Sequence, residues 1–177
     1  GFAGAPFTVA TYAIEGKTSK SFVETKRFFY RHPEAARRLL ALIGETTRDY
    51  LLAQVAAGAQ AIQIFDSWVG AVAPEDYRTH VLHYTSRIFA ELADLDVPRI
   101  HFGVGTGGLL GLMGEAGADV VGVDWRTPLA SAVPLVGDRA VQGNLDPTLV
   151  FAPTDVMTAR AAEVIEAGRT AKGHIFN

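Results

Sequence analysis

A short, mostly apolar run at residues 61–65 sets the strongest limit on the fold. The run contains two isoleucines and a phenylalanine, and Asp66 and Ser67 follow it directly. Such a run is typical of a strand buried on both faces of a parallel sheet. A long helical pattern ends just before it at Gly58, and another begins after it at Pro74. In folds of this kind ligands meet the sheet where its strands end, so the polar tip of this strand is a candidate binding position.

The rest of the chain alternates the same two patterns. Helices are expected at 18–31 (capped by Thr18 or Ser19), 33–58, 74–95, 109–116, 128–136 and 154–167 (capped by Thr154 or Asp155). Strands are expected at 61–65, 97–104, 120–124, 140–145 and, in part, 173–177, whereas 7–14 fits either a strand end or a short helix. About six strand segments alternating with helices indicate an α/β fold with a parallel sheet.

Two architectures fit this alternation, a doubly wound open sheet and part of a (β/α)8 barrel. A barrel typically needs about 250 residues, so a length of 177 alone favours the open sheet. Both ends of the sequence read as cuts through a larger fold, which weakens that preference. The sequence contains no linker, and we expect a single domain over 1–177.

Composition argues against several classes of protein. The formal net charge is −3 without a basic cluster, which argues against a nucleic-acid surface or a polybasic membrane patch. The absence of cysteine excludes disulfides and thiolate metal sites. No apolar run reaches the roughly 18 residues of a membrane span. A cytoplasmic location is therefore expected.

A glycine-rich segment, Gly103-Val-Gly-Thr-Gly-Gly108, matches the G-x-G-x-x-G pattern. It follows a predicted strand and precedes a predicted helix, and Asp124 lies about twenty residues further on, as in dinucleotide-binding proteins. The segment therefore predicts either a nucleotide or S-adenosylmethionine site, or a barrel loop whose glycines let a large ligand approach. Its position in the middle of the chain counts against the nucleotide site.

Five segments together resemble the uroporphyrinogen decarboxylase family. They are GFAGAPFTVATYAIEG at 1–16, GAQAIQIFDSWVG at 58–70, GADVVGVDW at 117–125, QGNLDP at 142–147 and GHIFN at 173–177. The resemblance implies a (β/α)8 TIM barrel of about twice this length, present here as a partial barrel of about six strands, the third to the eighth. It also implies an enzyme, usually a homodimer, that uses no metal or organic cofactor. The implied reaction removes carbon dioxide from the four acetate side chains of uroporphyrinogen, yielding coproporphyrinogen on the route to haem.

The resemblance also implies roles for four residues. Tyr12 matches the family's active-site tyrosine, which bonds a substrate carboxylate or orders the reacting acetate. Ser67 matches a serine that binds a substrate carboxylate, and Phe65 and Phe2 match apolar residues that line the pocket. Asp66 has no implied role.

Other groups of the implied site fall outside the sequence. The family's aspartate that binds the pyrrole nitrogens and its carboxylate-binding arginines would precede residue 1, and a histidine would follow Asn177. We therefore expect a polypeptide of these residues alone to have no useful decarboxylase activity.

Two further positions and two rival functions remain. Of the five histidines, His101 is expected to come nearest a cleft; Asp124 either reaches the cleft or forms an internal ion pair.

A corrinoid-linked methyltransferase would need a His-x-Cys zinc pair, but His101 is followed by Phe102 and Gly103. A non-catalytic relative that binds a tetrapyrrole without reacting stays open.

Overall fold

The computed structural model describes residues 1–17 and 19–177, and a single parallel sheet organises them. Its strands are β1 (Phe2–Gly4), β2 (Ile62–Asp66), β3 (Arg99–Gly103), β4 (Val120–Gly122), β5 (Ala140–Gln142) and β6 (His174–Ile175). They lie side by side in sequence order, and each neighbouring pair is parallel. A doubly wound sheet would reverse its strand order at a switch point, so the sequential order excludes it. The fold is an α/β partial barrel, and its six-stranded sheet is not closed.

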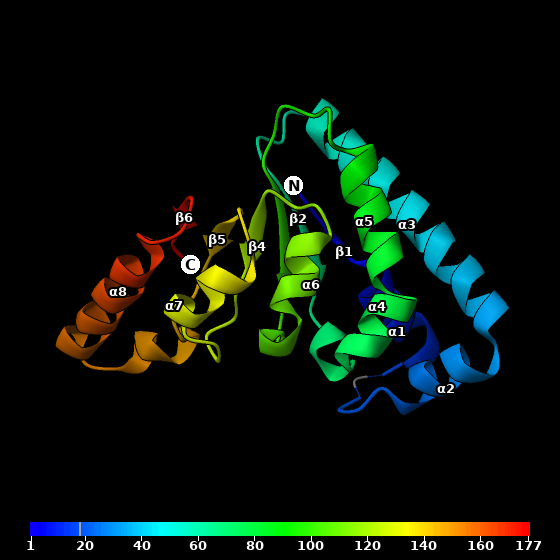
Figure 1. Cartoon of the computed structure of the whole chain (residues 1–177), viewed down its shortest axis with the longest axis horizontal. Coiled ribbons are helices and arrows are strands. Elements are labelled where there is room, and N and C mark those ends of the chain that lie inside the picture. The colour runs from blue at the N-terminus through cyan, green and yellow to red at the C-terminus, as the bar shows by residue number, and fades with distance from the viewer. Residues whose placement is uncertain (18) are drawn as a thin grey trace.

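Helices connect the successive strands. The α-helices are α1 (Pro6–Glu15), α2 (Val23–Arg31), α3 (Pro33–Ala56), α4 (Pro74–His80), α5 (Leu82–Glu91), α6 (Leu110–Glu115), α7 (Leu129–Ala132) and α8 (Thr154–Gly168). Short 3-10 turns are η1 (Val69–Ala71), η2 (Gly107–Leu109), η3 (Val133–Leu135) and η4 (Pro147–Phe151). Figure 1 shows α1 to α5 gathered beside β1 and β2, and α7 and α8 beside β5 and β6.

One hydrogen bond demonstrates that the sheet is strongly curved. Gln142 Nε2 on β5 donates to Gln63 Oε1 on β2 over 2.9 Å. These strands are three positions apart, and in a flat sheet they would be separated by about 14 Å with their side chains parallel. The two amides can meet only if the sheet bends toward them. Gln63 and Gln142 therefore lie on the concave face, which corresponds to the inside of a barrel.

The core lies on the other, convex face, between the strands and the helices. Ile62 and Ile64 of β2 are buried there with Leu51 of α3 and with Ile88 and Phe89 of α5. A second buried cluster joins α1, α3, α4 and α6 to β4 and β5. Burial of apolar surface on this face is the main term that holds helices to strands.

The segment that the sequence left open, 7–14, is helical, because α1 begins at Pro6 immediately after β1. Proline suits this first position, since it has no N–H to leave unpaired. The expected helix at 74–95 is interrupted at Val81, which is buried and non-helical and separates α4 from α5.

Side-chain capping was predicted wrongly at two helices. Helix α2 begins at Val23; Ser19 Oγ accepts from the N–H of Phe22 but is not the capping residue, and Thr18 lies outside the described residues. Helix α8 has Pro153 at its cap position and no side-chain cap bond. The remaining boundaries differ from expectation by a few residues, as fraying and turn residues at element ends allow.

Candidate functional site

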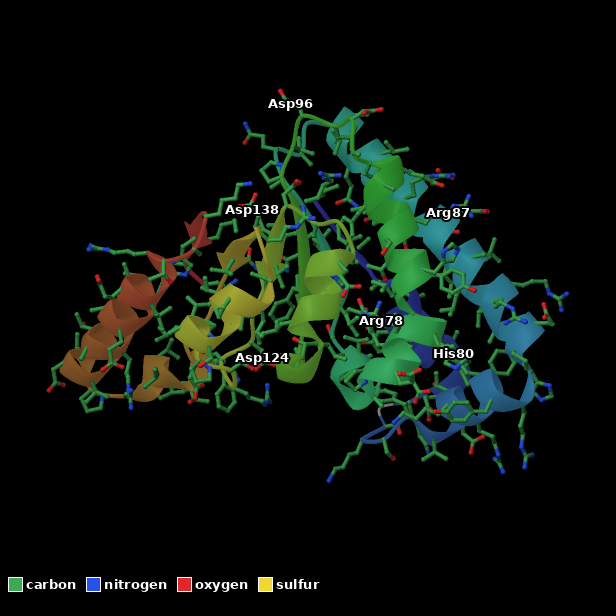
Figure 2. The ribbon with its side chains drawn as sticks, viewed as in Figure 1. Arg78, His80, Arg87, Asp96, Asp124 and Asp138 are labelled. Carbon is green, nitrogen blue, oxygen red and sulfur yellow. The ribbon has the colours of Figure 1, made fainter. Side chains whose placement is uncertain are left out.

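The edge of the sheet where the strands end brings together segments that are far apart in the sequence. Because all six strands are parallel, their carboxyl ends share this edge. Asp124 follows β4 there, whereas Asp96 and Asp138 lie before β3 and β5 at the opposite edge (Figure 2). The carboxyl edge is where ligands meet barrels and open α/β sheets.

Phe2 and Phe65 lie together on the concave face. Their ring centroids are 5.8 Å apart in an edge-to-face arrangement, and Phe65 makes a similar contact with Phe102 at 5.9 Å. Phe65 is two residues from Gln63 on the same strand, so it points to the same face. Phe2 is 65% exposed. These rings form an apolar strip across β1, β2 and β3 that is available for contact.

Tyr12 and Ser67 both lie beside Trp68. Tyr12 is on α1, is 56% exposed, and its ring centroid is 6.2 Å from that of Trp68. Ser67 is partly buried in the turn that follows β2, directly before Trp68. The structure therefore brings Tyr12 to the end of β2, although 55 positions separate it from Ser67 in the sequence.

Asp66, for which the family resemblance implies no role, connects these two segments. Its side chain is fully buried, and its Oδ1 accepts a 2.8 Å hydrogen bond from Thr8 Oγ1. The same hydroxyl oxygen accepts from the backbone N–H of Trp68 at 3.3 Å. Thr8 belongs to α1, so the contact fixes the helix that carries Tyr12 against the strand end that carries Ser67. The i, i+2 spacing of Asp66 from Ile64 is the pattern that could have placed it on the buried face.

His101 does not approach a cleft, and the expectation from the sequence is wrong. It is fully buried on the convex face, with its ring 5.5 Å from that of Phe89 and its Nε2 3.8 Å from Asp66 Oδ2. The reason is register: His101 pairs with Ile64, so both point toward the helices. The nearby Tyr77 is also buried, and that burial, with a smaller effect from the Asp66 carboxylate, raises the pKa of its hydroxyl.

The glycine-rich segment is held closely against its neighbours, although Gly105 and Gly108 are exposed. Asp124 is only 5% exposed; its Oδ2 accepts from the N–H of Gly105 and its Oδ1 from the N–H of Arg126 at 2.8 Å. A Cβ on Gly70 would lie 2.2 Å from the carbonyl oxygen of Val104, so this segment passes directly over η1. The acid that would bind ribose in a dinucleotide site thus holds the loop in place.

A cavity of about 360 Å³ opens at the ends of β3, β4 and β5. Its lining includes Phe102 of the aromatic strip together with Asp124, Trp125, Arg126 and Asn144. Asn144 Nδ2 donates to the backbone oxygens of Asp124 and Thr127, at 2.9 and 2.6 Å, and so fixes the cavity wall. The cavity can receive a polar group of a ligand whose apolar part contacts the rings.

The described residues contain neither a metal-binding cluster nor a membrane-spanning helix. Among residues 1–17 and 19–177 there is no group of three or more histidine, aspartate or glutamate side chains placed to hold a metal ion. In the same part of the chain, no helix combines the length and apolarity needed to cross a membrane.

Known proteins match this chain over its whole length. A family model described as uroporphyrinogen decarboxylase (URO-D) matches residues 1–177. Proteins named uroporphyrinogen decarboxylase from Nocardioides sp. and Thermobifida fusca are 64% and 55% identical over 100% of this chain, which covers 51% and 49% of their lengths. The chain thus spans about half the length of these curated relatives.

A solved structure supports the fold. A methyltransferase from Methanosarcina mazei superimposes with a TM-score of 0.81 over 99% of this chain and 51% of its own, at 20% sequence identity. At that identity the similarity supports the architecture alone.

Proposed function

The chain belongs to the uroporphyrinogen decarboxylase family, and we propose that the intact protein removes carbon dioxide from the four acetate side chains of uroporphyrinogen to yield coproporphyrinogen. The observation that carries the proposal is the 64% identity to a uroporphyrinogen decarboxylase across all 177 residues. The geometry agrees with a large, partly apolar, anionic ligand, because an aromatic strip adjoins a cavity lined in part by polar side chains, Arg126 among them, at the carboxyl edge of the sheet.

The chemistry requires a place for the electrons that decarboxylation leaves behind. Protonation of a pyrrole ring carbon makes an iminium-like sink, so the substrate can serve as its own cofactor. The protein must then stabilise the cationic ring and hold the reacting acetate in position. We assign the second task in part to this chain, and propose that neither a metal nor an organic cofactor takes part.

Tyr12 and Ser67 are the proposed donors to substrate carboxylates, and Phe2 and Phe65 the proposed apolar lining. The exposure of Tyr12, and its position beside Trp68, support access of a ligand to its hydroxyl. The edge-to-face contact of Phe2 with Phe65 supports their acting as one surface.

The proposal also covers the domain organisation, the oligomeric state and the cellular location of the protein. Residues 1–177 form one incomplete barrel domain, which the continuous six-stranded sheet supports. Family membership supports a homodimer of the intact protein and a cytoplasmic location.

The test is the conversion of uroporphyrinogen by the intact purified protein, with products separated by their number of carboxylates. Tyr12→Phe and Ser67→Ala each remove one hydrogen bond to a charged group, worth about 1.5–3 kcal/mol, so each should lower kcat/KM by about 10- to 150-fold. Tyr30→Phe is the matched control, because Tyr30 is equally exposed but bonds Asp76 on the outer helices.

The outcomes separate the two parts of the proposal. Binding of the tetrapyrrole without release of carbon dioxide would refute the decarboxylase and favour a non-catalytic relative. Full turnover by both site variants would leave the reaction intact and refute the assignment of Tyr12 and Ser67.

A further inference from the structure

Arg126 is a cation at the carboxyl edge of the sheet that the proposed function has not used. It follows β4 by four positions and lines the 360 Å³ cavity beside Trp125 and Asn144. Its side chain is 51% exposed. The cavity reaches the aromatic strip through Phe102, so a ligand seated on the strip would bring its polar groups toward Arg126.

The guanidinium is held in place but keeps its hydrogen-bond donors. Its central carbon lies 4.6 Å from the centroid of the Trp125 ring, a cation–π contact that orients the group without using an N–H. Arg126 Nη1 lies 3.7 Å from Asp124 Oδ1, at the outer limit of an ion pair. Among residues 1–17 and 19–177, the structure shows no acceptor within hydrogen-bonding distance of the Arg126 guanidinium.

The neighbouring carboxylate is already committed to the backbone. Both oxygens of Asp124 accept N–H groups, from Gly105 and from Arg126 itself. Arg99 on β3 provides the contrast, because its guanidinium forms two 2.8 Å hydrogen bonds with Asp119 and one with the backbone oxygen of Phe89. All three nitrogens of the Arg99 guanidinium donate hydrogen bonds inside the protein, whereas the Arg126 guanidinium lines the cavity and retains its donors.

We propose that Arg126 binds a side-chain carboxylate of the substrate and contributes to selectivity for polycarboxylate tetrapyrroles. The planar guanidinium offers parallel N–H groups that match the two oxygens of a carboxylate, a geometry that an ammonium group does not reproduce. The inference rests on the proposed function for the identity of the ligand. It concerns binding and not the chemical step, since Arg126 holds a carboxylate both before and during the reaction.

The test compares Arg126→Gln and Arg126→Lys with the unaltered intact protein in uroporphyrinogen turnover. Arg126→Gln should raise KM tenfold or more and change kcat less than twofold. This pattern is expected when the lost interaction is equally strong in the bound substrate and in the transition state. Arg126→Lys keeps the charge but loses the paired donors, so its KM should lie between those of the unaltered protein and Arg126→Gln. Arg139→Gln is the control, because Arg139 precedes β5 at the opposite edge of the sheet.

A second readout uses the tetracarboxylate product analogue coproporphyrin, whose binding quenches or shifts its own fluorescence. The dissociation constant should rise with salt more steeply for the unaltered protein than for Arg126→Gln, because added salt screens the removed charge pair. A merely structural role would not produce this difference in salt dependence. If Arg126→Gln does not fold, Arg126→Lys answers the question through KM, because it keeps the charge but loses the paired donors.

Three results would overturn the inference. They are an unchanged KM in a folded Arg126→Gln protein, a loss confined to kcat, or equal salt dependence of coproporphyrin binding. Absence of decarboxylation by the unaltered protein would instead refute the proposed function, and the coproporphyrin measurement would still decide whether Arg126 binds carboxylates.

Discussion

Replacing Gly70 with alanine should disturb the loop that forms one wall of the proposed site. Gly70 lies in η1, just after Ser67 and Trp68. An alanine Cβ would lie 2.2 Å from the carbonyl oxygen of Val104 and 2.7 Å from that of Gly105, where ordinary van der Waals contact begins at 3.4 Å. Both clashing groups are backbone atoms, so no side-chain rotation can relieve them, and the loop must move by about 1 Å.

The energetic cost follows from that displacement. Forcing extra atoms into a packed site typically costs about 1–3 kcal/mol. The moving loop includes Gly105, whose N–H donates to the buried Asp124 carboxylate. Losing a hydrogen bond to a charged group would add about 1.5–3 kcal/mol. We therefore expect Gly70→Ala to lower the free energy of unfolding by at least about 1 kcal/mol, and by several if the Asp124 contact is lost.

The assay is denaturant unfolding of the intact protein, followed by circular dichroism. Gly108→Ala is the matched control: it lies in the same glycine-rich segment, but a Cβ there meets nothing within 4 Å. Its expected effect is between zero and a gain of about 1 kcal/mol, from reduced freedom of the unfolded chain. Equal stability of the Gly70→Ala and Gly108→Ala proteins would refute the argument that Gly70 is required for close packing.

Two further predictions concern groups beneath and behind the site. Thr8→Val removes the hydroxyl that donates to Asp66 Oδ1, and it should lower the free energy of unfolding by about 1–3 kcal/mol because a buried carboxylate loses its partner. Thr46→Val is the control, since that exposed hydroxyl is bonded within its own helix. It should change the free energy of unfolding by less than about 0.5 kcal/mol in the same denaturant measurement. The Arg99 guanidinium lowers the pKa of Asp119 below its ordinary value of 3.8, so the pair stabilises the folded state above that pH and loses this effect as pH falls through the lower, folded-state pKa. The stability difference between the unaltered protein and Asp119→Asn, measured by unfolding from pH 6 to pH 2, should therefore shrink at the acid end; a constant difference would contradict the ion-pair argument.

The sequence predicted the elements of the fold better than their arrangement. Strand and helix periodicities are local properties, and they identified the strands around Ile64, His101 and Val121. Strand order is not local, so the alternation alone could not separate a doubly wound sheet from a partial barrel. The family resemblance favoured the barrel, and the parallel pairing of each strand with the next confirms it. The N-terminal caps of α2 and α8 were predicted wrongly, because neither helix has a side chain that caps its first turn.

Within the site, the direction of side chains was the hardest property to read. Strand β3 has apolar or aromatic groups on both faces, so alternation could not tell which face His101 occupies. Its pairing with Ile64 decides that question, and pairing depends on contacts between strands 37 positions apart. The same limit applied to Asp66, whose polar character suggested exposure at a strand tip although it lies beneath Thr8. The roles of Tyr12, Ser67, Phe65 and Phe2 stay predictions.

The arrangement of the two acidic residues at the strand ends is compatible with the anionic ligand that we propose for this edge. An exposed carboxylate beside a polycarboxylate substrate would repel it, and the cost would rise in a site shielded from water. Asp66 avoids this by turning to the convex face against Thr8, and Asp124 by binding two backbone N–H groups. Both acids thereby stabilise the loops; Asp66 lies on the convex face, and the carboxylate of Asp124, which lines the cavity, is compensated by the two N–H groups. Arg126 provides a cation at the cavity wall, and because Asp124 accepts backbone N–H groups, the Arg126 donors remain for the carboxylate that we propose it binds.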